Sequence, residues 1–168
     1  MSSSDARRRA LLACAGGAWL LTGCGFKLRE LPTLTFRRIA LVGFPPRSPL
    51  AAELRRNLER QVTVTEDVAS AELVLQALSE SRERSIVAQT AAAQVRVLQL
   101  RLRFEFRVQT PAGRELVPLT QLALARDMTY NETYALAKEQ EQDELFREMQ
   151  ADIAEQVIRR LATVRLPG

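Results

Sequence analysis

One segment of the chain alternates strictly between apolar and polar residues, and it constrains the fold more than any other feature. Apolar side chains occupy every second position of residues 98–109, and the positions between them are polar or charged. A period of two over this length predicts a long β-strand with one face toward a core and the other toward solvent. A Thr-Pro-Ala-Gly turn at residues 110–113 follows, so residues 114–128 should return as the antiparallel partner of a hairpin. Pro118 predicts that the returning strand lies at a sheet edge or carries a bulge.

Two other segments have the spacing of amphipathic helices. Leu50, Leu54 and Leu58 form one apolar stripe, and Ser48-Pro49 in front of them suits the start of a helix that runs to about residue 60. A longer stripe between Leu145 and Leu161 predicts a helix over residues 134–161.

Shorter strands are expected at residues 36–43, 62–65 and 72–78. Residues 79–84 are polar and charged, and residues 85–93 suit either a strand or a mobile loop. Val95 and Val97 are out of phase with the long strand, which predicts a bulge or a strand start near Val97. The order of elements predicts an α+β domain, in which two helices pack on one face of a mostly antiparallel sheet.

The side-chain inventory excludes several kinds of catalytic site. The 168 residues include two cysteines and no histidine, which rules out Ser-His and Cys-His nucleophile pairs and leaves a zinc site poorly supplied. The acidic residues at the start of the last predicted helix are explained by the helix dipole. We therefore predict a protein that is not an enzyme and that needs no dissociable cofactor.

The N-terminus has the pattern of a bacterial lipoprotein signal. Three arginines at residues 7–9 precede an apolar run that is shorter than the ~20 residues of a membrane span and suits the h-region of a signal peptide. The run ends in Leu-Thr-Gly-Cys at residues 21–24, which resembles a lipobox. We predict a signal peptide at residues 1–23, a lipidated tether at residues 24–35 and a single domain at residues 36–168. Cys24 would carry S-diacylglycerol and N-acyl lipid.

Two details bear on export and sorting. Gly25 follows the lipidation site, where an aspartate would resemble an inner-membrane retention signal, and this favours the outer membrane. Residues 8–12 weakly resemble a twin-arginine signal, so the Sec and twin-arginine routes both stay open.

The basic residues are almost all arginines, since Lys27 and Lys138 are the only lysines. Arg101, Arg103 and Arg107 fall on the polar face of the long predicted strand. They form either a solvated face balanced by Glu105 or a ladder of anion contacts.

Arg82 and Arg84, in the preceding segment, could extend such a ladder. Nucleic acid is not the expected anion, because the chain without its signal peptide has a net charge of only about +2 and few aromatic residues. A phosphorylated glycolipid suits an outer-membrane lipoprotein better.

Motifs at both ends of the predicted mature chain resemble one family. The run Cys-Gly-Phe-Lys-Leu-Arg at residues 24–29 resembles the start of the LptE family of lipopolysaccharide-assembly lipoproteins. Ala-Leu-Ala-Lys at residues 135–138, with the acidic and apolar sequence that follows to residue 161, is similar to the C-terminal helix of that family.

The resemblance implies an α/β roll anchored in the outer membrane. It implies a plug in the lumen of the LptD β-barrel, in a 1:1 heteromer that delivers lipopolysaccharide to the cell surface. Lys138 matches the lysine through which the family binds lipopolysaccharide. A second basic position, near residues 87–89, is not matched, and Arg82 or Arg84 could replace it. A different class stays open as the alternative, namely an accessory lipid-carrier lipoprotein of a periplasm-spanning transport ATPase complex.

Overall fold

The computed structural model describes residues 32–91 and 94–166. The predicted signal peptide and the predicted lipidation site at Cys24 lie outside these residues. In chain order the elements are β1 (Arg38–Val42), α2 (Pro49–Leu58), β2 (Thr63–Thr65), the 3-10 turn η2 (Val68–Ser70), β3 (Leu73–Gln89), β4 (Val95–Gln109), β5 (Glu115–Thr129), the 3-10 turn η3 (Glu132–Tyr134) and α3 (Ala135–Leu161).

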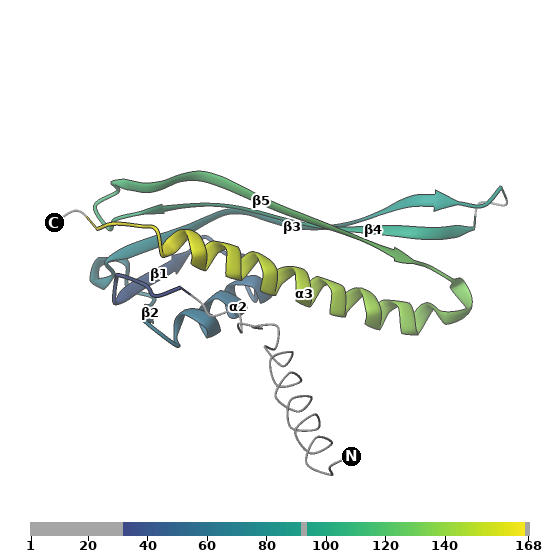
Figure 1. The fold of residues 1–168 in the computed structure, drawn as a ribbon, viewed down its shortest axis with the longest axis horizontal. Helices are drawn as coiled ribbons and strands as arrows, with labels where there is room; N and C mark the ends of the chain where they lie inside the picture. Colours follow the sequence, from purple (N-terminus) through teal and green to yellow (C-terminus); the bar gives the residue numbers. More distant parts are fainter. Residues whose placement is uncertain (1–31, 92–93, 167–168) are drawn as a thin grey trace, which may run out of the picture. The chain divides into compact units, whose positions relative to one another are not determined.

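The five strands form one sheet in the order β2-β1-β3-β4-β5. The long strands β3, β4 and β5 pair in antiparallel register, whereas the short β1 runs parallel to both β2 and β3. Helices α2 and α3 lie on the same side of the sheet (Figure 1). The predicted α+β class, with a mostly antiparallel sheet and helices on one face, is confirmed.

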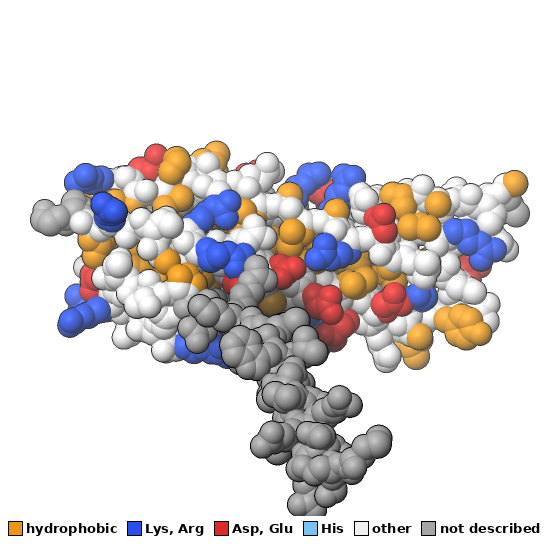
Figure 2. Space-filling model, viewed as in Figure 1, with side chains coloured by type: hydrophobic (Ala, Val, Ile, Leu, Met, Phe, Trp, Pro, Cys, Tyr) orange, Lys and Arg blue, Asp and Glu red, His pale blue; other side chains and the backbone are white. Residues whose placement is uncertain are grey.

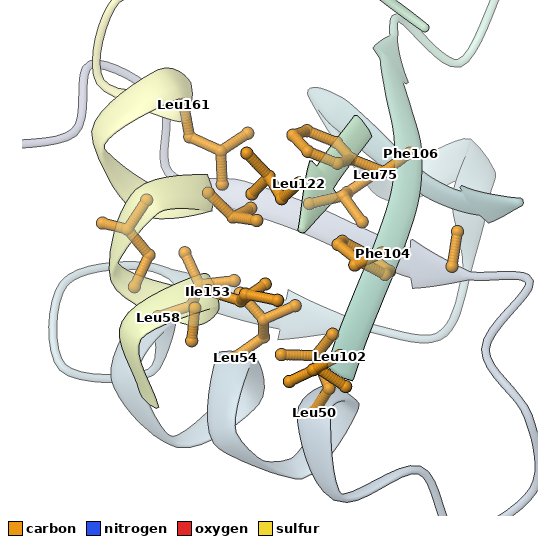
Figure 3. Close-up of a cluster of buried hydrophobic side chains, with 14 of the residues drawn as sticks. Leu50, Leu54, Leu58, Leu75, Leu102, Phe104, Phe106, Leu122, Ile153 and Leu161 are labelled. Carbon is orange, nitrogen blue, oxygen red and sulfur yellow. The ribbon is translucent and has the colours of Figure 1, made fainter. Parts of the chain in front are cut away.

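The core lies between β4 and the two helices. The apolar positions of the alternating segment, from Leu98 to Val108, are all buried, and their polar neighbours point the other way. The stripe of α2 and the side chains of α3 from Phe146 to Leu161 face them (Figure 3). Burying a leucine or phenylalanine side chain contributes about 1.5–3 kcal/mol, so this layer stabilises the domain.

Helix α2 begins where the sequence predicts. The Ser48 hydroxyl accepts a hydrogen bond from the Ala51 amide at 2.9 Å, and Pro49 occupies the first helical position. The same hydroxyl donates to a Glu80 carboxylate oxygen at 2.6 Å. The cap therefore also joins the helix to β3.

Strand β3 is much longer than predicted. It continues through the polar residues 79–84 and the small residues beyond them to Gln89, paired with β4 throughout. The register shifts between Ile86, Ala88 and Gln89 lie opposite the region of Val97, which confirms the predicted irregularity there. Pro118 lies on the edge strand β5, close to a register shift, as predicted.

Candidate functional site

The sheet register separates the predicted basic residues into two groups. Arg82 pairs with Leu102 and Arg84 pairs with Leu100, so both arginines share the face that packs against the helices. Arg101 and Arg103 lie on the opposite face, because the side-chain direction alternates along a strand. The expectation that Arg82 and Arg84 extend the ladder of Arg101 and Arg103 is therefore wrong.

The arginines of the outer face are engaged with neighbouring side chains. Arg103 pairs with a Glu83 carboxylate oxygen at 3.3 Å, and Arg101 donates to Gln99 at 2.7 Å. Arg107 donates to Gln76 at 2.8 Å. Basic side chains are scattered over the visible surface among other types (Figure 2). These contacts make the outer face a hydrogen-bonded polar surface.

Glu105 does not balance these arginines directly. Its carboxylate accepts a hydrogen bond from Gln121 of β5 at 3.1 Å. Glu105 thus contacts the neighbouring strand β5 and not the arginines of β4. Glu83 of β3 supplies the negative charge that pairs with Arg103.

Lys138 lies near the start of α3 and is held between two partners. Its ammonium group donates to the Thr129 hydroxyl at 3.2 Å and to a Glu141 carboxylate oxygen at 2.7 Å. Only 18% of its side chain is exposed. An incoming anion would have to compete with Glu141 for this cation.

Arg84 borders a pocket near the same end of α3. The pocket has a volume of about 250 Å³ and is lined by Arg84, Ile86, Val95, Leu98, Tyr130 and Glu132. Arg84 reaches Gln142 of α3 at 3.4 Å. One cation, one carboxylate and several apolar side chains give this pocket both polar and apolar walls.

Arg82 lies beside a different pocket, where β3 meets α3. Its guanidinium carbon is 5.4 Å from the centre of the Phe146 ring, a cation–π contact. Gln150 is nearly fully buried, and with its amide oxygen turned toward β3 it accepts from Arg82 Nε at 3.3 Å. The pocket measures about 290 Å³, and Pro49, Asp143 and Arg147 complete its lining.

The sequence interpretation missed the partners of Arg82. Phe146 and Gln150 are four residues apart and therefore share one face of α3, as buried side chains of a helix do. The spacing was visible in the sequence, but a glutamine inside an apolar stripe gives no sign of which strand it faces.

Residues 32–91 and 94–166 hold no group of three or more His, Cys, Asp or Glu side chains arranged to bind a metal ion. None of the helices in this part of the chain is long and apolar enough to cross a membrane.

The match to known proteins extends over nearly the whole chain. The family model described as "LptE: Lipopolysaccharide-assembly" matches residues 36–161. The chain is also 33% identical, over 164 residues, to the LPS-assembly lipoprotein LptE of Yersinia pestis strain Pestoides F, covering 94% of this chain and 78% of the relative.

The chain belongs to the LptE family.

Solved structures support this fold. The solution NMR structure of a lipoprotein B from Nitrosomonas europaea superposes with a TM-score of 0.70 at 26% identity, covering 83% of this chain and 91% of that one. The crystal structure of the rare lipoprotein B from Shewanella oneidensis gives a TM-score of 0.65 at 24% identity, covering 76% and 95%. The sheet with two helices on one face is thus an arrangement that this chain shares with bacterial lipoproteins of known structure.

Proposed function

We propose that this LptE-family protein is an outer-membrane lipoprotein that plugs and helps to assemble the LptD β-barrel, and that it takes part in delivering lipopolysaccharide to the outer leaflet. The family match across residues 36–161 carries the proposal. The lipobox at residues 21–24 supports it, because lipid on Cys24 would hold the domain at the periplasmic face of the membrane, from which it enters the barrel lumen.

The protein acts by binding in this proposal and catalyses no reaction. Its polar groups are arranged as hydrogen-bond partners of one another, as in the contacts of Lys138 with Thr129 and Glu141. Such a domain is suited to fill a lumen and to present a defined surface to the barrel, in a 1:1 complex.

Depletion of the protein tests the main proposal. LptD should then be misassembled, and lipopolysaccharide should stay inside the cell; both are measured by the mobility of LptD on gels and by surface labelling of lipopolysaccharide. Normal surface lipopolysaccharide after depletion would contradict the proposal. Purification of the lipidated protein should recover an outer-membrane barrel in equal amount, whereas recovery of an inner-membrane transport ATPase would favour the alternative class.

Lipopolysaccharide binding is the second part of the proposal, and Lys138 and Arg84 are its first candidates. Both lie on the helix-facing side of the sheet toward the start of α3, and the pocket beside Arg84 combines a cation with apolar walls. The cation suits the phosphate groups of lipopolysaccharide, and the apolar walls suit its acyl chains. Arg101 and Arg103 are weaker candidates, because they lie on the opposite face and Arg103 already has an acidic partner.

Substitutions at Lys138 and Glu141 test this binding site. Lys138→Glu should weaken binding of purified lipopolysaccharide to the full chain, while Lys138→Arg should retain it. Glu141→Gln should strengthen binding, because it frees the ammonium group from its present carboxylate partner. Arg101→Glu, a charge reversal on the outer face, is the matched control. Equal affinities for all four variants would leave Lys138 with a purely structural role.

A further inference from the structure

The long strand β3 has an open edge. Its pairing with β1 ends at Gln76, whereas its pairing with β4 continues to Gln89. Within the described part of the chain no strand pairs with the other side of β3 beyond Gln76. Register shifts between Ala77 and Ser79 and after Ile86 bound a regular stretch, residues 79–86, and this stretch presents unpaired backbone N–H and C=O groups.

Two long edges of the sheet have no neighbouring strand among the described residues, namely the outer edge of β5 and the edge of β3 beyond Gln76. They differ in how they are protected against pairing with a further strand. The outer edge of β5 contains Pro118, which has no backbone N–H and discourages a further strand. Residues 79–86 contain no proline and no lysine. Bulges, a further protection, lie at the ends of this stretch and do not interrupt it. Charged side chains also protect an edge, and this stretch has four.

Those four charged side chains are held over the faces of the sheet. Glu80 accepts from Ser48, and Glu83 pairs with Arg103. Arg84 reaches Gln142, and Arg82 lies over Phe146. Because each contacts an element of its own domain, none of them needs to lie along the backbone of the edge.

Among the described residues, neither Arg82 nor Arg84 has an ion-pair partner, and each borders a pocket; Arg82 lies nearer the middle of the stretch 79–86. Asp143 lines the 290 Å³ pocket beside Arg82 but does not come within ion-pair distance. Ile86, half exposed, lies four residues farther along the same face of the strand.

We propose that residues 79–86 of β3 bind an extended acidic segment of a partner protein, which adds to the sheet as a further strand. The segment would place a carboxylate opposite Arg82 and an apolar side chain four positions away, against Ile86. Backbone hydrogen bonds would supply the general affinity, and the Arg82 pocket would select the acidic residue. The inference rests on the edge and its charges alone and is independent of the proposed role with LptD.

Hydrogen exchange of the full chain, with a defined peptide as probe, tests the proposal. The probe is a threonine-rich nonapeptide with glutamate at its centre and valine at both ends; a second peptide has glutamine at the centre. The glutamate peptide should slow exchange of the amides in residues 79–86 and leave those of β5 unchanged. Arg82→Gln should weaken its binding about two- to five-fold, the range of an exposed ion pair, and Arg101→Gln, on the opposite face, should not.

Three outcomes would overturn the proposal. Protection of β5, or of no strand at all, would show that the β3 edge does not accept a strand. Equal binding of the two peptides, unchanged by Arg82→Gln, would remove the acidic specificity. Protection of residues 79–86 without peptide, increasing with protein concentration, would identify a second copy of the chain as the occupant.

Discussion

Gly43 decides where the chain leaves the sheet. Its φ angle is +80°, a conformation that side chains with a Cβ rarely adopt, and an added Cβ would overlap the backbone carbonyl oxygen of Ala77. The residue follows β1 directly and leads the chain toward α2, so β1 ends and the rest of β3 stays unpaired on that side. A single residue type thus permits both the crossing to α2 and the open edge.

Gly43→Ala should destabilise the domain by about 3 kcal/mol or more, the sum of left-handed backbone strain of about 1–2 kcal/mol and the overlap with Ala77. The free energy of unfolding by denaturant measures the effect. Gly113→Ala is the matched control, because Gly113 has a similar φ of +86° but no atom within 4 Å of an added Cβ. It should lose only the strain, and equal losses for the two variants would show that the contact with Ala77 costs nothing.

At the scale of elements, the sequence predicts those strands and helices that bury one regular face. The alternation of β4 and the stripes of α2 and α3 were sufficient, and their bounds agree with the structure to within a few residues. The far half of β3 was not predictable in this way. Most of its side chains are exposed on both faces, since it lies at an edge and Arg82 and Arg84 occupy positions on the helix-facing side. Without a buried face there is no period of two to detect.

The packing of α3 on the sheet depends on its fully buried face. Ile153→Ala should cost about 2–5 kcal/mol, because the side chain has no exposed surface and its removal leaves a cavity. Asp152→Ala, at the preceding residue, removes only a half-exposed side chain that pairs with Arg126 at 3.5 Å, and its cost should stay below about 1 kcal/mol. Denaturant unfolding of both variants gives the comparison. A similar loss in the two would mean that α3 is held by its surface contacts.

At the scale of the molecule, the candidate site could be predicted only in part. The family resemblance located Lys138, and the structure gave it partners, Thr129 and Glu141, that no spacing indicated. The arginines were found as residue types, but their separation onto two faces follows from the register of β3 with β4. Register across a hairpin depends on bulges and loop geometry, which a single sequence specifies weakly where the strand is polar on both sides.

The two halves of α3 are attached to the sheet by different kinds of contact, and this predicts unequal stability along one helix. From Phe146 onward one face of α3 is buried, whereas residues 135–145 include no fully buried side chain and contact the rest of the domain through Lys138, the Arg84–Gln142 contact and the partly buried Leu145. Segments with few buried apolar contacts open locally at lower free energy.

Amides of residues 139–145 should therefore exchange with solvent at least about ten-fold faster than those of residues 150–161, a difference of about 1.4 kcal/mol or more in opening free energy. Hydrogen exchange of the full chain measures both halves at once, and Glu148→Ala, an exposed change on the well-packed half, serves as the control that should leave the contrast intact. Uniform exchange along α3 would contradict the prediction, because it would mean that the polar contacts near Lys138 hold the helix as firmly as the buried core does.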